Sequence, residues 1–363
     1  MKEAVVVSTA RTPIGRAFRG ALNNIKSPTM MGHAIRHAVA RAGIEGGEVD
    51  DLIVGTVLSA GTAGMNIARQ AGLAGGLPAT VSAQTMDRQC SSGLMAIATA
   101  AKQIVVDGMQ IVVAGGQDNI SAVQNRYMEW VAQEQDANVT RAAAHAYMPM
   151  LQTAEFVSRK YGISREQQDI YALESQRRTA EAQAAGRFDA EIVPIEATMA
   201  VVNKETKEVS YRPVTLSRDE GNRPDTTLAN LQSLAPVIEG GTVTAGNASQ
   251  LSDGASACVL MEARLAERKG LEPLGVYRGM TVAGCAPEEM GIGPIYAIPK
   301  LLKQHGLSIG DIGLWELNEA FACQVLYCRD FLEIDPARYN VNGGSIAIGH
   351  PYGMTGARLV GHA

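Results

Sequence analysis

Short apolar runs rich in β-branched residues alternate with longer segments of helical spacing in the first third of the chain. The apolar runs are AVVVST, LIVGTVL and QIVVAG, at residues 4–9, 52–58 and 110–115. The segments of helical spacing between them span residues 29–43, 66–75 and 91–107. An apolar run without polar alternation is typical of a strand buried on both faces, as in a parallel sheet covered by helices. The pattern therefore predicts an α/β layered fold.

The middle of the chain is more polar than its two ends. Residues 116–240 contain a charged helical segment at about 164–186 and long irregular loops. We expect this part to be an insertion or lid, because loops carried on a rigid scaffold often bind ligands.

The apolar pattern returns after residue 241, so the two ends of the chain resemble distant copies of one unit. In the second copy we expect a helix at 294–305 and strands at 256–262, 274–284 and 312–317. The loop containing Cys90 opens a helix that a strand follows, whereas the helix opened by the His350 loop has no matching strand after it. This interpretation divides the chain into an N-terminal half, an inserted region and a C-terminal half without its final strand, at residues 1–115, 116–240 and 241–363.

Composition and charge exclude several classes of partner. The 363 residues are 46% hydrophobic and 19% charged, with a net charge of −5 and no Lys/Arg-rich run. These values are typical of a globular protein and argue against a nucleic-acid partner. No apolar stretch approaches the roughly 18 residues that a membrane span needs. The five cysteines are scattered without a CxxC pair, which favours the reducing cytoplasm over an oxidising compartment.

One cysteine has a setting that suits a nucleophile. In MDRQCSSGLMAI, Cys90 precedes Ser91, Ser92 and Gly93 at the predicted start of a helix. Helix N-termini present free N–H groups and a partial positive charge, both of which stabilise a thiolate. Small neighbours admit a substrate carbonyl, and the Cys90 N–H suits a developing oxyanion. The alternative is a buried cysteine that acts as a small hydrophobic residue, and local context leaves both open.

Two further stretches offer polar groups for the same chemistry. His350 lies between Gly349 and Pro351 in GHPYGMTGA, where a restricted backbone aims the ring and makes it a candidate base. Asn318, in ELNEAFA, follows a predicted strand and suits the binding of a water or an oxyanion. A structural histidine and a plain helix cap at Asn318 stay open as alternatives. The small residues of GTVTAGNASQLSDGA, at 241–255, suit either close approach to a ligand or close packing.

The sequence offers no complete metal site. His33 and His37 have the i, i+4 spacing of two ligands on one helix face, but no third ligand accompanies them, so a surface or packing role is favoured. The P-loop, GxGxxG, HExxH and GxSxG motifs are absent. We therefore expect no metal.

Several motifs, in order along the chain, resemble those of the thiolase family, the acyl-CoA:acetyl-CoA C-acyltransferases. They are RQCSSG, GTVTAGNAS, NEAFA and GGSIAIGHPYGMTGAR, and the resemblance extends to TAEFVSRKYGISREQQDIYALESQRR, RPDTT and MGIGPIYAIPK. It runs from VVVSTARTPIG to the last residue. The resemblance implies a thiolase fold of two similar βαβαβαββ halves in five layers, α-β-α-β-α, with a loop domain inserted in the first half.

The resemblance also implies roles for individual residues. Cys90 would be the nucleophile that takes the acyl group. His350 would activate it and, together with a water held on Asn318, would stabilise the thioester oxyanion. Contacts to the acyl group and coenzyme A would come from Met150, Arg223, Ala245, Ser249, Ala320 and Phe321.

The implied reaction cleaves a 3-ketoacyl-CoA to acetyl-CoA and a shortened acyl-CoA, or condenses acetyl-CoA in the reverse direction. Acyl-CoA and coenzyme A are then substrates, and no separate cofactor is expected. The family resemblance further implies a homodimer or homotetramer. The charge pattern and the absence of a long apolar stretch predict no nucleic-acid and no membrane partner.

The chain departs from the family pattern at one point. Thiolases supply a second catalytic cysteine from a C-terminal CxGGG loop, and no such motif is present. Cys323 and Cys328 have a helical, apolar setting that does not suit this role. Two interpretations follow, a thiolase whose given sequence is truncated, or a natural variant that binds acyl-CoA with impaired or no turnover. The open sheet edge that a missing strand would leave favours the first.

Overall fold

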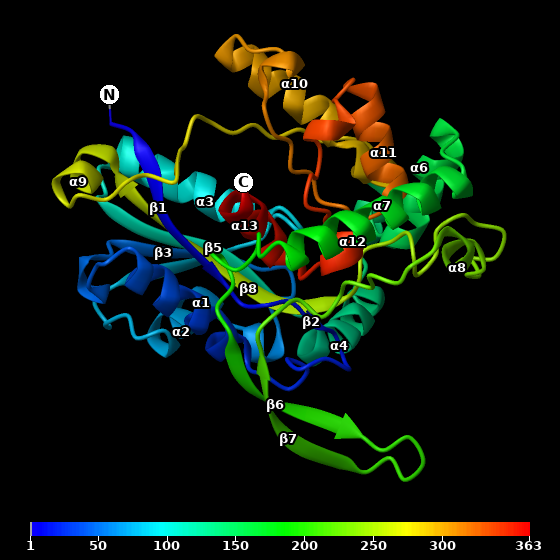
Figure 1. Ribbon diagram of the computed structural model, residues 1–363, viewed down its shortest axis with the longest axis horizontal. Coiled ribbons are helices and arrows are strands. Elements are labelled where there is room, and N and C mark those ends of the chain that lie inside the picture. The colour runs from blue at the N-terminus through cyan, green and yellow to red at the C-terminus, as the bar shows by residue number, and fades with distance from the viewer. Residues whose placement is uncertain (1) are drawn as a thin grey trace.

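A mixed sheet forms the centre of the computed structural model, which describes residues 2–363 (Figure 1). Its strand order is β4-β3-β5-β8-β1-β9, and the short β2 pairs with β8. These strands are β1 (Ala4–Arg11), β2 (Gly15–Arg16), β3 (Asp51–Gly55), β4 (Ser82–Met86), β5 (Ile111–Asn119), β8 (Ser252–Glu262) and β9 (Gly275–Val276). β3 runs parallel to β4 and β5, as expected. β1 runs in the same direction as these strands, but it does not pair with them, because β8 lies between β5 and β1 and is antiparallel to both.

Helices cover both faces of this sheet and build the inserted region. They are α1 (Ser27–Arg41), α2 (Ile67–Ala74), α3 (Ser92–Lys102), α4 (Ile120–Gln133), α5 (Ala137–Ala142), α6 (Met150–Tyr161), α7 (Arg165–Ala184), α8 (Leu228–Gln232), α9 (Ala263–Arg268), α10 (Pro294–His305), α11 (Ala322–Phe331), α12 (Ser345–Ile348) and α13 (Tyr352–His362). The helices that we expected in the first half, in the inserted region and at 294–305 are confirmed as α1, α2, α3, α7 and α10. α3 continues as a π-helical turn, Gln103–Asp107.

Alternate side chains of each strand face opposite helical layers. Leu52 and Val54 of β3 pack in one core with α1 and α2. Ile53, between them, packs in a second core with α3 and with Ala357 of α13. This alternation, with both faces apolar, explains why the strand sequences read as continuous hydrophobic runs.

The strands expected in the last part of the chain are corrected by the structure. Residues 256–262 do form a strand, but this strand is β8 and belongs to the same sheet as β1, so the first sheet extends past the boundary expected at residue 241. Of 274–284 only β9 is a strand, and 312–317 contributes only a bridge between Trp315 and Tyr339. A strand requires a neighbour for its backbone N–H and C=O groups, and within residues 2–363 these segments have none along most of their length.

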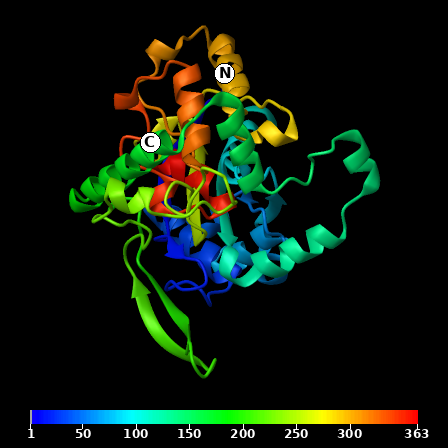
Figure 2. The same ribbon diagram turned by 90° about the vertical axis from the view of Figure 1, so that its right-hand side faces the viewer.

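The inserted region projects from the body in two places. A hairpin of β6 (Ile195–Val202) and β7 (Val209–Leu216) extends away from the sheet (Figure 1). α4, α5 and the loop after them form a second excursion (Figure 2). Among the described residues, no helix combines the length and apolar character required to cross a bilayer.

Candidate active site

Cys90 lies in a tight turn between β4 and α3. Gln89 has a φ of +48°, an uncommon backbone conformation for a residue with a side chain. The Ser92 hydroxyl holds this turn, because it donates to the Gln89 carbonyl (2.6 Å) and accepts from the Arg88 N–H (2.8 Å). Cys90 is therefore fixed directly before Ser91, the N-cap of α3, and so close to the start of this helix, as the sequence predicts.

The resting sulfur of Cys90 is a thiol. Burial, together with the carboxylates of Asp118 and Asp87, raises the pKa of Cys90 to about 12, against a smaller opposing effect of a backbone hydrogen bond. The start of α3 therefore does not by itself produce the thiolate that we expected, because the sulfur is withdrawn from water and faces negative charge. A base must take the thiol proton.

His350 is fixed on both sides of its ring and is 3% exposed. Its backbone N–H donates to the Gln250 carbonyl (3.0 Å), and Gly349 precedes it with a φ of +116°, which favours glycine. Nδ1 lies 2.6 Å from Thr355 Oγ1, and that hydroxyl donates to the Pro351 carbonyl (3.1 Å). Because the hydroxyl proton is engaged, we assign the ring proton to Nδ1 and the lone pair that can accept a hydrogen to Nε2.

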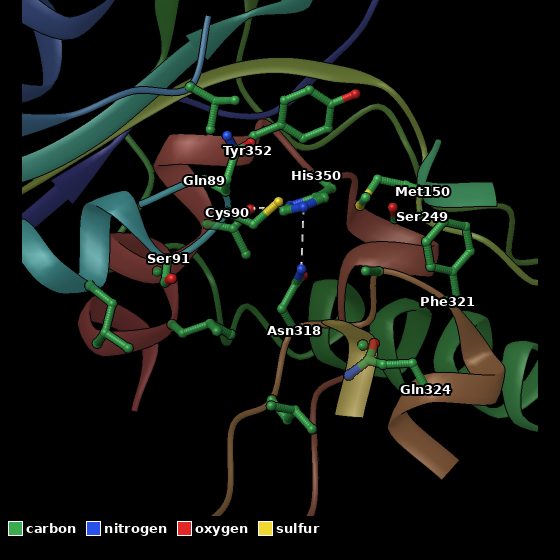
Figure 3. Close-up of a pocket in the computed structure, with 18 of the residues that line it drawn as sticks. Gln89, Cys90, Ser91, Met150, Ser249, Asn318, Phe321, Gln324, His350 and Tyr352 are labelled. Atoms are coloured by element: carbon green, nitrogen blue, oxygen red, sulfur yellow. Dashed lines mark hydrogen bonds between the residues drawn. The ribbon is translucent and has the colours of Figure 1, made fainter. Parts of the chain in front are cut away.

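The His350 ring is neutral at physiological pH. Burial, with a smaller effect of the Arg358 charge, lowers the pKa of His350 to about 3. A neutral imidazole is the form that accepts a proton. Figure 3 shows the Cys90 sulfur pointing toward this ring.

Asn318 contacts the other ring nitrogen of His350, Nε2. Its Nδ2 lies 3.3 Å from His350 Nε2, and its Oδ1 accepts from the Ser345 hydroxyl (2.6 Å). The Ser345 bond fixes the amide orientation, so that the NH₂ group faces the histidine (Figure 3). Asn318 is thus a polar site residue and not a helix cap, since α11 begins only at Ala322.

The structure brings all the predicted site residues to one cavity of about 3040 Å³. Its lining includes Cys90, His350, Asn318, Met150, Arg223, Ala245, Ser249, Ala320 and Phe321. Backbone pairing holds two of these segments together, since the Ser249 N–H donates to the Ala320 carbonyl (2.9 Å) and Ala248 bridges to Phe321. The small residues of 241–255 therefore serve close approach at the cavity wall.

The other candidate groups are not part of this constellation. Cys323 and Cys328 are buried in α11, where burial raises the pKa of each thiol to about 12. The rings of His33 and His37 are neighbours on α1, with centroids 4.5 Å apart. Residues 2–363 contain no cluster of three or more His, Cys, Asp or Glu side chains arranged to hold a metal ion.

Sequence reasoning missed the residues that support the site. Ser345 and Thr355 flank His350 within one predicted motif, so a search for hydroxyls near the candidate base would have found them. Asp118 was not recognisable, because its distance along the chain from Cys90 and Gly353 conceals a buried contact.

Comparisons with known proteins agree along the whole chain. Residues 4–264 match the family model described as "Thiolase, N-terminal domain", and residues 271–363 match "Thiolase, C-terminal domain". The chain is 46% identical to a 3-ketoacyl-CoA thiolase of Bacillus subtilis over 360 residues, which covers 99% of this chain and 91% of that protein.

Solved structures give the same result. A Bacillus anthracis acetyl-CoA acetyltransferase superposes with a TM-score of 0.87 and 38% identity, covering 100% of this chain and 91% of the other. The human mitochondrial 3-ketoacyl-CoA thiolase superposes with a TM-score of 0.86 and 37% identity, covering 99% and 91%. The expected fold is thereby confirmed.

Proposed function

This chain belongs to the thiolase family and is an acyltransferase enzyme of the 3-ketoacyl-CoA thiolase type, and we propose that Cys90, His350 and Asn318 carry out its chemistry. The observation that carries the proposal is a protonated, partly buried thiol that points toward a neutral, hydrogen-bonded imidazole in one cavity (Figure 3). Nothing in the structure or the comparisons favours the alternative of a non-catalytic relative.

In the first half-reaction, His350 Nε2 accepts the Cys90 proton and the sulfur attacks the 3-keto carbon of the substrate. The Cys90 N–H and a water on Asn318 suit the oxyanion that develops there. The C2–C3 bond then breaks, and its electron pair forms the enolate of acetyl-CoA. C2 must then take up a proton, and among the described site residues the protonated His350 ring holds the one that Cys90 released. Its transfer to C2 returns the ring to its neutral form, so the first half-reaction balances.

In the second half-reaction, free coenzyme A attacks the acyl group on Cys90. The incoming thiol loses its proton, the new thioester forms, and the Cys90 sulfur leaves and regains a proton. His350 serves both directions because its neutral ring accepts a proton and its protonated ring returns it. Both half-reactions are redox-neutral exchanges at sulfur, so we propose coenzyme A as substrate and no further cofactor.

We also propose where the substrate lies. Ser249, Ala245, Ala320 and Phe321 line the cavity wall that would contact the pantetheine, and the exposed Arg223 stands where it would meet a coenzyme A phosphate. Met150, at the start of α6, lies beside the His350 ring (Figure 3), where it would contact the acyl group.

We further propose a compartment, a pathway class and an oligomeric state for the protein. The five cysteines are free, which supports a reducing cytoplasm, and the proposed pathway class is fatty acid metabolism. Exposed Met128, Trp130 and Val131 on α4 support a homodimer or homotetramer, which sedimentation analysis would measure.

The function is tested by thiolytic cleavage of acetoacetyl-CoA and of a longer 3-ketoacyl-CoA with free coenzyme A. The loss of the substrate's enolate absorbance measures the rate. The wild-type protein should turn over, and Cys90→Ser should lose at least about 1,000-fold in kcat/KM. Cys258→Ser, at a buried thiol of β8, is the matched control and should keep its activity. Full turnover by Cys90→Ser would overturn the assignment.

A further inference from the structure

Asp118, at the end of β5, accepts hydrogen bonds from two distant parts of the chain. The Thr56 hydroxyl (2.9 Å) and the N–H groups of Val57 (3.1 Å) and Leu58 (3.0 Å) donate from the segment after β3. The N–H of Gly353, in the first turn of α13, donates from the other side (2.6 Å). The carboxylate is fully buried. It therefore joins β3, β5 and the helix that follows His350.

The backbones around Asp118 meet at glycines. A Cβ on Gly353 would lie 2.7 Å from Thr56 Cα and 2.8 Å from the Gln117 carbonyl oxygen. Gly93 of α3 and Gly116 of β5 both abut the Gly353 carbonyl. α3, which follows Cys90, and α13, which follows His350, are thus in direct backbone contact at this point. A small shift of α13 moves Thr355, and with it the His350 ring.

The charges around Asp118 are unusual for a buried carboxylate. No cation lies within salt-bridge distance of it among residues 2–363. The titratable groups that face it are Cys90, beside α3, and Tyr352, on α13, and Asp87 also faces Cys90. Burial raises the pKa of Asp118 to about 6, against the hydrogen bonds it accepts. Its charge, when present, opposes ionisation of the thiol.

We propose that Asp118 is a positioning residue for the thiolase reaction: its carboxylate sets the start of α13, and hence His350, against Cys90, and it places a buried negative charge beside this junction. The inference rests on the proposed roles of Cys90 and His350. Substitution by asparagine removes the charge and turns an NH₂ group or a poorer acceptor toward the Gly353 N–H. Loss of such a charge-assisted bond in a buried site costs about 1.5–3 kcal/mol, which corresponds to about 10- to 150-fold.

The test is the iodoacetamide inactivation rate of Cys90 as a function of pH, together with steady-state kinetics, in wild type, Asp118→Asn and Asp118→Glu. The inactivation midpoint is the pH at which the inactivation rate is half of its maximum. We expect Asp118→Asn to lower this midpoint by at least about half a pH unit. We also expect it to lower kcat by about 10-fold or more with little change in KM. Asp118→Glu keeps the charge, so its midpoint should stay near that of the wild type even where kcat falls.

Asp253 provides a matched control. Asp253 is also buried, and burial raises its pKa to about 6 as well. It lies opposite Asn119 in the adjacent strand, but its carboxylate accepts from the Ser121 N–H of α4 and not from the residues around Cys90 and His350. Asp253→Asn should leave the Cys90 midpoint unchanged. The proposal is overturned if Asp118→Asn leaves the midpoint and kcat unchanged, or if Asp253→Asn shifts the midpoint equally.

A second variant covers the case in which Asp118→Asn does not fold. Thr56→Val removes one donor to the carboxylate and keeps the side-chain shape, so Asp118 protonates at a higher pH. The acid limb of the kcat profile should then move to higher pH, and an unmoved limb contradicts the proposal. Because alkylation of Cys90 does not depend on turnover, absence of thiolysis in the wild type would separately reject the proposed function.

Discussion

At the scale of single residues, Cys90 rests as a protonated thiol and His350 rests as a neutral imidazole. Burial explains both, since it disfavours the thiolate of Cys90 and the imidazolium of His350. We therefore propose that the two groups exchange a proton only when substrate offers a carbonyl to the sulfur. The sequence identifies both residues by their motifs, but their protonation states depend on burial, which the motifs do not encode.

The bond from Ser345 to Asn318 gives the first prediction at this scale. Ser345→Ala leaves the Asn318 amide free to rotate, so we expect kcat to fall by about 3- to 30-fold with little change in KM. Ser158→Ala removes a comparable buried hydroxyl on α6 that donates to the Ile163 carbonyl, and should leave kcat unchanged. Equal effects of the two substitutions on kcat would show that Asn318 needs no such support.

The pKa of His350 predicts a pH dependence of stability. The ring stays neutral in the folded state down to about pH 3, whereas the unfolded chain binds a proton below about pH 6.5, so folding loses stability as the pH falls between these values. Between pH 7 and pH 5 the free energy of unfolding of His350→Gln should drop by about 2 kcal/mol less than that of the wild type.

Urea titrations at both pH values provide this comparison. Asp118 and Asp253, whose raised pKa values act in the opposite direction, are present in both proteins and cancel in the difference. Parallel pH dependence of the two proteins would mean that folding does not lower the pKa of His350.

At the scale of elements, α3 and α13 bring the two ends of the chain together. Gly93, Gly116 and Gly353 lie where these helices meet β5, and they permit the backbone contact that aligns the Cys90 and His350 loops. We expect Gly353→Ala to destabilise the fold by at least about 1–3 kcal/mol, because its Cβ would meet Thr56 Cα and the Gln117 carbonyl.

Gly313→Ala is the control for this prediction. Gly313 is exposed, and a Cβ there would meet no atom within 4 Å. Its melting temperature should stay within about 2 °C of the wild type. Equal melting temperatures of Gly353→Ala and the wild type would show that the junction is loosely packed.

The sequence predicts the individual elements of the first half well and the pairing of the later ones poorly. The continuous apolar runs of β1, β3 and β5 and the helical spacing of α1, α2 and α3 are local signals. β8 is also apolar, but only its contacts with β1 and β5 show that it belongs to their sheet. The segment 274–284 has an apolar pattern and lacks partner strands for most of its length, so pattern alone overstates it.

The candidate site shows the same contrast between local sequence signals and long-range contacts. Short motifs single out Cys90, His350 and Asn318, and the structure brings the three residues to one cavity. Their roles as nucleophile, base and amide stay predictions. Ser345, Thr355 and Asp118 act through contacts between separate motifs, which a single sequence does not reveal.

At the scale of the whole molecule, a buried ionic network connects the first strand, the inserted region and the last helix. Arg11 of β1 binds Asp219 through two nitrogens (2.7 and 2.9 Å) and Glu191 through Nε (2.8 Å). His362 of α13 lies 3.0 Å from the other Glu191 oxygen. These charges are withdrawn from water, so each depends on its partners.

Asp219→Asn should therefore destabilise the protein by about 3–5 kcal/mol, since it leaves the Arg11 guanidinium partly unpaired in the interior. Glu181→Gln removes an exposed pair with Arg177 on α7 and should change stability by less than about 0.5 kcal/mol. Denaturant unfolding of the two variants measures the contrast. A similar small change in both would show that the network is dispensable.

The central claim is that Cys90 carries the acyl group between two coenzyme A molecules. Peptide mass spectrometry after incubation with acetoacetyl-CoA, in the absence of free coenzyme A, tests it most directly. We predict an acetyl adduct on the peptide containing Cys90 that disappears when coenzyme A is added. An unmodified Cys90 in protein that turns over, or an adduct confined to another cysteine, would contradict the account.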